Sequence, residues 1–209
     1  MMKHGRNCPI KGLYAITPDE TDTAELLRKV RLALQGGARV LQYRNKVADV
    51  ALRLEQARVL RALTREFSVP LIINDDVKLA QQVDADGVHL GSEDGSVAAV
   101  SGSGKLVGVS CYNRIALAQE AVRQGADYVA FGAFFYSSVK PEAVVADVKL
   151  LRQARAELNV PVVAIGGITV HNGPQLLEAG ADALAVISAV FGAMDIQGIA
   201  RQFSNLNYS

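Results

Sequence analysis

Short apolar runs alternate with longer amphipathic segments along almost the whole chain. The runs are rich in Ala, Val, Leu and Ile and are bounded by Gly, Pro, Asn or Asp, which is typical of buried strands. The segments between them carry apolar residues at the spacing of a helix with one buried face. The pattern predicts eight strands, at 12–17, 40–44, 70–74, 87–91, 106–110, 128–134, 161–166 and 183–188. It predicts intervening helices such as 23–35, 50–66, 114–124 and 148–158.

One unit recurs in this pattern, at 32–46, 79–91, 119–134 and 176–189. Each copy has a helix end, a short break that usually contains Gly, then Ala and usually Asp, and finally an apolar strand. Gly36, Gly125 and Gly180 suit the left-handed position that ends a helix, where a Cβ is penalised. Repeated strand–helix units indicate a parallel sheet.

Eight strands alternating with helices in 209 residues are close to the minimum for a (β/α)8 TIM barrel, so we predict one α/β barrel domain over 1–209. A doubly wound open sheet is the alternative, although no GxGxxG motif follows the first strand. Half of the residues are hydrophobic but only 6% are aromatic, as expected for a parallel sheet buried on both faces. The polar residues 1–11 are predicted to form a flexible N-terminal tail.

Charge and cysteine content narrow the possible partners and compartment. Lys and Arg number 22 and Asp and Glu 21, a net charge of +1. This balance gives no general attraction for nucleic acid or an anionic membrane, so an anionic ligand needs a local cluster of cations. Cys8 and Cys111 are far apart and lack metal-type spacing, which predicts free thiols. With no signal-like or membrane-spanning apolar stretch, we expect a soluble cytoplasmic protein; the oligomeric state is left open.

Polar residues gather where the predicted strands end, which is the active-site face of such a barrel. Asp75 and Asp94 follow the third and fourth strands, and their carboxylates suit Mg²⁺, which binds carboxylate oxygens together with water and substrate phosphates. The alternative is that both acids only cap the helices that follow. Arg44, Lys46 and Lys140 follow the second and sixth strands, so the metal-loaded pocket would be net positive and would suit a diphosphate.

The last two strands end in Ala-Ile-Gly-Gly-Ile (164–168) and Ala-Val-Ile-Ser-Ala (185–189). In many barrels the loops after the seventh and eighth strands bind a phosphate through backbone N–H groups. Gly167 would allow the backbone to approach a phosphate, and Ser188 has a hydroxyl to donate. The alternative is that the glycines only pack the barrel rim tightly.

Seven motifs follow one another at the predicted strand ends between about residues 12 and 192. They are Gln42-Tyr43-Arg44-Asn45-Lys46, Ile73-Asn74-Asp75-Asp76, Gly87-Val88-His89-Leu90-Gly91 with Asp94, Gly108-Val109-Ser110, the loop 132–140, Ala164-Ile165-Gly166-Gly167-Ile168 and Ile187-Ser188. Each motif is weak alone, but their order and spacing make the chain resemble the thiamine phosphate synthase family, also called thiamine-phosphate pyrophosphorylases.

The resemblance implies a condensation of 4-amino-2-methyl-5-pyrimidinylmethyl diphosphate with 4-methyl-5-(2-phosphoethyl)thiazole, or its 2-carboxy form. The products would be thiamine phosphate and pyrophosphate. It assigns the pyrimidine diphosphate to Gln42, Arg44, Lys46, Asn74, Ser110 and Lys140, of which Arg44, Lys46, Ser110 and Lys140 would be catalytic. It assigns Mg²⁺ to Asp75 and Asp94, and the thiazole phosphate to Ser137, Ser138, Val139, Gly167, Ile187 and Ser188.

The sequence departs from the family at Val139, where Thr is usual. Without the hydroxyl we expect weaker thiazole phosphate binding, by roughly one hydrogen bond or about 0.5–1.5 kcal/mol. Two other functions stay open: a thiazole tautomerase of the same barrel family, and a non-catalytic barrel that binds a phosphorylated metabolite. The tautomerase would not need the cations and acids after strands two to four, and only Val139 favours the non-catalytic barrel. His89 is predicted to be a hydrogen-bonded core residue, and Cys111 is not expected to be catalytic.

Overall fold

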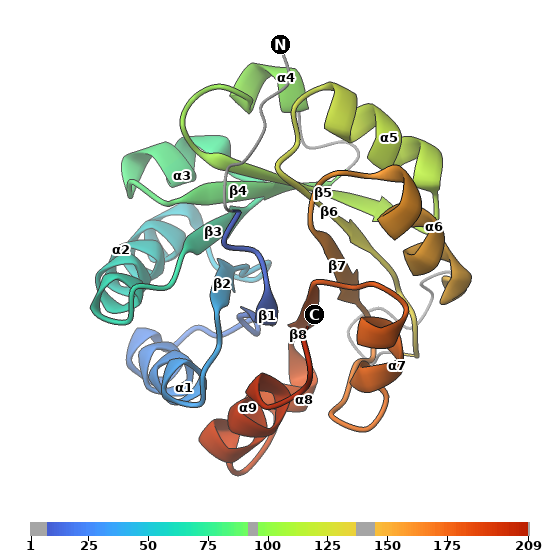
Figure 1. Ribbon diagram of the computed structural model, residues 1–209. Coiled ribbons are helices and arrows are strands. Elements are labelled where there is room, and N and C mark those ends of the chain that lie inside the picture. Colours follow the sequence, from blue (N-terminus) through green and yellow to red (C-terminus); the bar gives the residue numbers. More distant parts are fainter. Residues whose placement is uncertain (1–7, 92–95, 137–144, 209) are drawn as a thin grey trace.

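Eight parallel strands close into a barrel in the computed structural model, which describes residues 8–91, 96–136 and 145–208. Each strand pairs with its neighbours in sequence, and the first pairs with the last (Figure 1). The strands are β1 (Gly12–Ile16), β2 (Val40–Tyr43), β3 (Leu71–Asn74), β4 (Gly87–Leu90), β5 (Leu106–Tyr112), β6 (Tyr128–Phe131), β7 (Val162–Ile165) and β8 (Ala183–Val186). The predicted (β/α)8 barrel is therefore confirmed and the open sheet is excluded.

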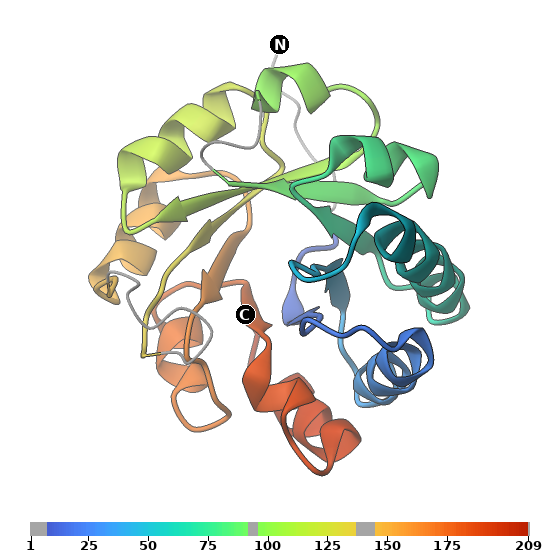
Figure 2. The ribbon, with the colours of Figure 1, turned by 180° about the vertical axis from the view of Figure 1, so that it is seen from behind.

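Helices surround the strands on the outside of the barrel, as the two opposite views in Figures 1 and 2 show. They are α1 (Thr23–Gln35), α2 (Val50–Glu66), α3 (Val77–Gln82), α4 (Val97–Val100), α5 (Ile115–Arg123), α6 (Lys149–Glu157), α7 (Gly173–Glu178), α8 (Ser188–Phe191) and α9 (Ile196–Ser204). Asp22, Asp49 and Asp195 accept hydrogen bonds from the first turns of α1, α2 and α9, as N-cap residues do. In the described part of the chain, no helix combines the length and apolarity needed to cross a membrane.

Two apolar layers hold the barrel together. The outer layer packs the strands against the helices, with Leu26, Leu60 and Leu151 fully buried. The inner layer fills the barrel interior and includes Tyr14 and Tyr128, along with Ile10, Ile16, Val40, Ile72, Ala130, Val163, Ala183 and Ala185. Ile10 is 1% exposed, so the segment that packs against the barrel begins earlier than the predicted tail of 1–11 allows. Residues 1–7 lie outside the described range.

The Asp of the recurring unit ties neighbouring strands together at the N-terminal end of the barrel. One carboxylate oxygen of Asp86, Asp127 and Asp182 accepts the backbone N–H of Leu71, Val107 and Val162, respectively, at 2.7–2.9 Å. Each Asp also donates its own backbone N–H to the carbonyl of that same residue. The Asp of the unit therefore aligns the start of its strand with the start of the preceding strand. This role is structural, and it lies at the end of the barrel opposite the site.

Candidate active site

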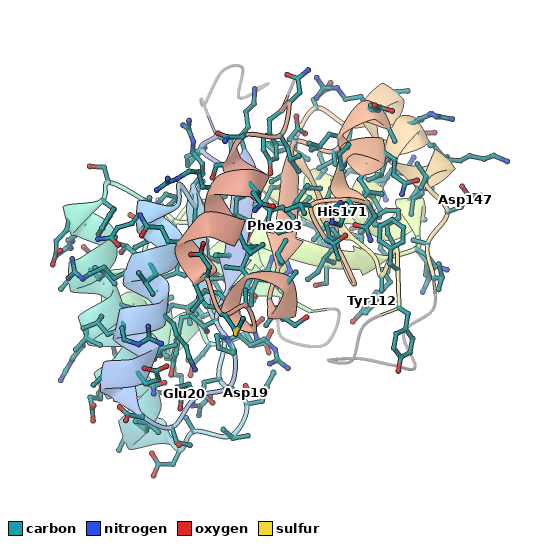
Figure 3. The ribbon with its side chains drawn as sticks, turned by 90° about the horizontal axis from the view of Figure 1, so that it is seen from below. Asp19, Glu20, Tyr112, Asp147, His171 and Phe203 are labelled. Carbon is teal, nitrogen blue, oxygen red and sulfur yellow. The ribbon has the colours of Figure 1, made fainter. Side chains whose placement is uncertain are left out.

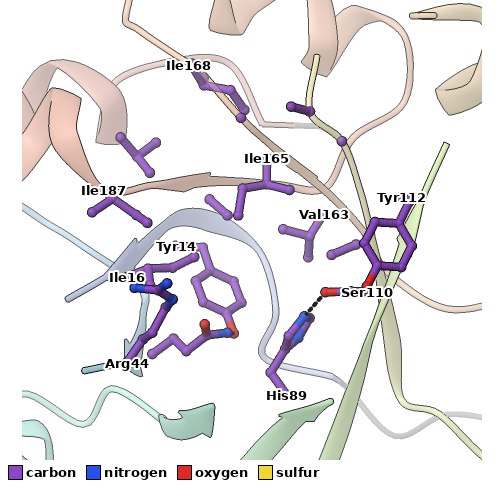
Figure 4. Close-up of a pocket in the computed structure, with 18 of the residues that line it drawn as sticks. Tyr14, Ile16, Arg44, His89, Ser110, Tyr112, Val163, Ile165, Ile168 and Ile187 are labelled. Carbon is purple, nitrogen blue, oxygen red and sulfur yellow. Dashed lines mark hydrogen bonds between the residues drawn. The ribbon is translucent and has the colours of Figure 1, made fainter. Parts of the chain in front are cut away.

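A cavity of about 730 Å³ opens at the C-terminal end of the barrel. Its size is within the range of small-molecule sites. The predicted site residues that line it are Gln42, Arg44, Asn74, Ser110, Gly167, Ile187 and Ser188. The close-up in Figure 4 shows Tyr14, Arg44, His89 and Ser110 on one side and the branched side chains of Val163, Ile165 and Ile187 on the other. The site thus has a polar half, on β1 to β5, and a mostly apolar half, on β6 to β8.

A second cavity of about 520 Å³ adjoins the first at β2 and β3. Arg44 and Asn74 border both cavities, and Lys46 and Asp75 line the second one. The described residues among those predicted to bind the pyrimidine diphosphate are therefore contiguous, with the mostly apolar cavity at one end and the charged cavity at the other.

Arg44 is held in place by two residues of the segment that follows β1. The Thr17 hydroxyl accepts the backbone N–H of Arg44 at 2.8 Å and donates to its carbonyl at 2.7 Å. Asp19 lies 3.3 Å from the Arg44 guanidinium and accepts the backbone N–H of Lys46 at 2.7 Å. Asp19 lies toward the lower edge of the molecule in Figure 3. One acid thus orients the loop that carries both cations.

Asp75 is surrounded by donors at the mouth of β3. Its carboxylate accepts from Lys46 Nζ at 2.5 Å and from Asn74 Nδ2 at 2.6 Å. The Lys46 side chain is 53% exposed, and an ion pair of this kind contributes at most about 1 kcal/mol. Lys46 can therefore leave Asp75 at little cost when a cation binds the carboxylate or an anion binds the ammonium.

The backbone of Asp75 argues against a mere capping role. Its φ is +63°, a left-handed conformation that is uncommon outside glycine and often found at functional sites. Its N–H is held by the carbonyl of His89 at 2.8 Å. The N-cap of α3 is the next residue, Asp76, whose side chain accepts from Leu79 N at 2.9 Å. The capping alternative is therefore wrong for Asp75.

Five predicted site residues lie outside the described residues: Asp94, Ser137, Ser138, Val139 and Lys140. The N-cap position of α4 is Ser96, two residues beyond Asp94. Within the described ranges, no group of three or more His, Cys, Asp or Glu side chains is arranged to hold a metal ion. The magnesium site therefore stays a prediction, with Asp75 as its described member.

The glycines after β7 have a packing role that the sequence left open. Gly167 has φ +62°, and a Cβ there would lie 2.2 Å from the carbonyl oxygen of Tyr136. The same contact region is tied by backbone hydrogen bonds from Phe134 to Ile165 and from Phe135 to Gly166. The sequence predicts that the sixth strand reaches residue 134, but β6 ends at Phe131. The two hydrogen bonds join the segment after β6 to the end of β7. Gly167 thus brings the loop after β6 against the loop after β7, at the edge of the cavity.

A chain of hydrogen bonds crosses the barrel interior, and all its members except Tyr128 line the cavity. It runs from Gln42 Nε2 to the Tyr14 hydroxyl (2.9 Å), the Tyr128 hydroxyl (2.8 Å), His89 Nδ1 (3.1 Å) and, from His89 Nε2, the Ser110 hydroxyl (2.9 Å). Burial lowers the pKa of His89 to about 4 and raises the pKa of both tyrosines. All three side chains are therefore neutral at pH 7. The prediction that His89 is a hydrogen-bonded core residue is confirmed.

The two cysteines are free, as predicted, and Cys111 is fully buried between Ser110 and Tyr112. Burial raises the pKa of the Cys111 thiol to about 12. A thiol with so high a pKa carries almost no thiolate at neutral pH, so Cys111 is not an activated nucleophile.

Comparisons with known proteins show the family of this chain. A family model described as thiamine monophosphate synthase matches residues 13–190. A thiamine-phosphate synthase of Methylobacillus flagellatus is 56% identical over 201 residues, which cover 95% of this chain and 96% of that protein. A thiamine-phosphate synthase of an Azoarcus species is 58% identical over 189 residues, covering 89% of this chain and 92% of its own.

Solved structures give the same result. A thiamine phosphate pyrophosphorylase from Pyrococcus furiosus has a TM-score of 0.83 at 37% identity, with 92% of this chain and 93% of that chain covered. A 3-hexulose-6-phosphate synthase shares the fold alone, with a TM-score of 0.69 at 18% identity over 92% of this chain and 98% of its own. With a family model that spans most of its length and relatives above half identity, this chain belongs to the thiamine monophosphate synthase family, transferases of thiamine biosynthesis.

Proposed function

We propose that the protein joins 4-amino-2-methyl-5-pyrimidinylmethyl diphosphate to a thiazole ethyl phosphate and releases pyrophosphate. Where the thiazole carries a 2-carboxylate, that group leaves as CO2 and a proton replaces it. The observation that carries this proposal is the pair of adjoining cavities, one apolar and one charged, that share Arg44 and Asn74. A substrate with an aromatic ring and a diphosphate needs this combination. The relatives named thiamine-phosphate synthase supply the reaction class.

The charged cavity supports binding of the diphosphate. Arg44 and Lys46 line it, and Asp19 contacts the guanidinium of Arg44 and the backbone N–H of Lys46. The Arg44 guanidinium is held in place by Asp19, and a cation that is already in position stabilises charge on a leaving group without reorganisation during the reaction. Lys140, which lies outside the described residues, would add a third cation.

The carboxylate oxygens of Asp75 suit a hydrated magnesium ion once the Lys46 ammonium has moved away from them. A carboxylate at the mouth of the charged cavity, beside bound phosphates, is the setting in which proteins hold Mg²⁺. Asp75 and Asp94 would hold the ion, and Lys46 would move from the Asp75 carboxylate to the phosphate. The bound ion would supply positive charge to the departing pyrophosphate.

The reaction needs positioning rather than a protein nucleophile. The bond between the pyrimidinylmethyl carbon and the pyrophosphate oxygen breaks, and its electron pair leaves with pyrophosphate. The electron-rich aminopyrimidine stabilises the carbon cation, and the thiazole nitrogen attacks it to form the new C–N bond. Holding two substrates face to face in one cavity raises their effective concentration by orders of magnitude.

The apolar half of the large cavity supports binding of the thiazole. Ile165 and Ile187 face the cavity, and Gly167 and Ser188 border it. Ser188 begins α8, and the first N–H groups of a helix have no partner within the helix. The thiazole phosphate would bind there and to the loop residues Ser137, Ser138 and Val139, which lie outside the described residues.

A reconstituted assay tests the proposal. Purified protein with both phosphorylated substrates and Mg²⁺ is expected to form thiamine phosphate and pyrophosphate in equal amounts, and EDTA is expected to stop both. A tube with the thiazole phosphate alone serves as the control, since a tautomerase would rearrange it without the pyrimidine. The absence of product at saturating substrates would refute the proposal, and product formation that ignores EDTA would refute the metal role.

A further inference from the structure

The buried chain from Gln42 to Ser110 has only two self-consistent arrangements of its hydrogens. Each phenol has a single hydrogen to donate, and a neutral imidazole carries one N–H and one acceptor nitrogen. The direction of the bond at one end therefore fixes every bond in the chain. Gln42 and Ser110, which both line the cavity, are therefore coupled through Tyr14, Tyr128 and His89.

The direction follows from the Gln42 amide, whose Nε2 is the atom placed toward Tyr14. The Tyr14 oxygen accepts from Gln42, so its hydrogen goes to Tyr128, and the hydrogen of Tyr128 goes to Nδ1 of His89. His89 is then protonated at Nε2 and donates to the Ser110 oxygen. The hydrogen of the Ser110 hydroxyl is left to point into the cavity, and the amide oxygen of Gln42 is left as an acceptor.

The barrel holds the middle of this chain rigidly. Tyr14 and Tyr128 are at most 1% exposed. Gly108 of β5 makes room for the Tyr128 ring, because a Cβ at this glycine would lie 2.0 Å from the ring carbon that carries the hydroxyl. Tyr128 also packs against both neighbours in the chain, with ring centroids 6.1 Å from Tyr14 and 5.6 Å from His89. A buried polar group that loses its partner is destabilising, so the network resists rearrangement.

We propose that Tyr14, Tyr128 and His89 are positioning residues that make Ser110 a hydrogen-bond donor and Gln42 an acceptor toward the same ligand. This inference rests on the proposed function and deepens it. The pair selects a heteroaromatic ring that offers an amine to Gln42 and a ring nitrogen to Ser110, which is the chemistry of an aminopyrimidine. In an analogue with a carbonyl in place of the amine, the carbonyl oxygen would face the amide oxygen of Gln42, and neither could donate a hydrogen bond.

The first test reads the His89 tautomer directly, without substrates. The chain contains His4, His89 and His171. Long-range ¹H–¹⁵N spectra of histidine-labelled protein, assigned with the His4→Asn and His171→Asn variants, are expected to show His89 protonated at Nε2 and unprotonated at Nδ1. Protonation at Nδ1 would overturn the proposal. This result is independent of turnover, so a failure here is distinct from a failure of the synthase assay.

The second test breaks the chain with Tyr128→Phe, which keeps the ring and removes the link. His89 is expected to lose its single tautomer, and the KM for the pyrimidine diphosphate is expected to rise about three- to tenfold, as for one lost hydrogen bond. The KM for the thiazole phosphate is expected to stay within about twofold. Tyr14→Phe is expected to raise the same KM and serves as the second variant if Tyr128→Phe does not fold.

Tyr43→Phe is the matched control. Tyr43 is equally buried, but its hydroxyl donates to Gln56 of α2 and does not belong to the chain. It is expected to leave the His89 tautomer unchanged. Loss of the single tautomer in Tyr43→Phe, or unchanged spectra and an unchanged KM in Tyr128→Phe, would show that the tyrosines only stabilise the fold.

Discussion

Acidic residues lie at both ends of this barrel, but their carboxylates have different kinds of partner. At the N-terminal end, Asp127 accepts the backbone N–H of Val107 and donates its own N–H to the same residue. At the C-terminal end, Asp75 has a left-handed backbone, and its carboxylate is bonded to the flexible side chain of Lys46. The first carboxylate is committed to the fold, whereas the second has a partner that can be exchanged. The same residue type is thus structural at one end and available for chemistry at the other.

The largest expected effect comes from Asp75→Asn. Removing the charge while keeping the shape should lower kcat by roughly 10²–10³-fold, as for the loss of one electrostatic contact to a reacting group. Stability should not fall, because Asn tolerates a positive φ at least as well as Asp. Steady-state kinetics and thermal unfolding measure the two quantities. A KM for the thiazole phosphate that worsens as much as kcat would indicate a structural role for Asp75.

Gly167→Ala tests whether a residue at the C-terminal end of the barrel can serve both packing and ligand binding. The added Cβ would meet the backbone of Tyr136 at a positive φ, so we expect a loss of stability of about 2–4 kcal/mol. The displaced loop borders the apolar half of the cavity, so the KM for the thiazole phosphate should rise more than that for the pyrimidine diphosphate. Gly102→Ala is the control, since it also has a positive φ but a Cβ there meets nothing within 4 Å. Equal effects of the two variants would show that backbone strain alone is responsible.

The same contrast explains what the sequence could predict. Apolar runs bounded by turn residues locate all eight strands, because each strand of a parallel barrel is buried and ends at a polar loop. The strand ends then give the candidate site, and Gln42, Arg44, Asn74 and Ser110 do line one cavity. The end of a strand can be recognised from the residues next to it in the sequence, which is why this part of the prediction succeeds.

Contacts between distant segments were harder to predict. Asp19 pairs with Arg44 across 25 residues, and nothing near Asp19 in the sequence distinguishes it from a helix cap. Tyr14 and Tyr128 lie 114 residues apart. A strand buried on both faces has no alternation to show which side chains point inward, so both tyrosines read as ordinary core residues. Aromatic residues are scarce in this chain, and a hydroxyl-bearing one inside a predicted strand is the signal that could have identified them.

Asp127→Ala is the counterpart of the Asp75 substitution at the other end. It leaves the buried N–H of Val107 without its carboxylate acceptor, so we expect a loss of about 1–3 kcal/mol in the free energy of unfolding. The kcat should stay within about twofold of the wild type, because the site is at the opposite end. Asp127→Asn retains an acceptor oxygen and should cost less. Denaturant unfolding and steady-state kinetics measure the two quantities. Impaired turnover in Asp127→Ala without a loss of stability would contradict the contrast between the two ends of the barrel.

Cys111→Ala should have the smallest effect. It tests whether a residue near the C-terminal end of a strand matters for the reaction when its side chain points away from the cavity. Cys111 lies beside Ser110 near the C-terminal end of β5, yet it belongs to the outer apolar layer, and its thiol contacts the carbonyl of Val109. Neighbouring residues of a strand point to opposite faces, so Ser110 reaches the cavity and Cys111 does not. We expect kcat within about twofold and a stability loss near 1 kcal/mol for the small cavity left behind. A large loss of turnover in a stable Cys111→Ala protein would mean that the outer face of β5 also takes part in the reaction.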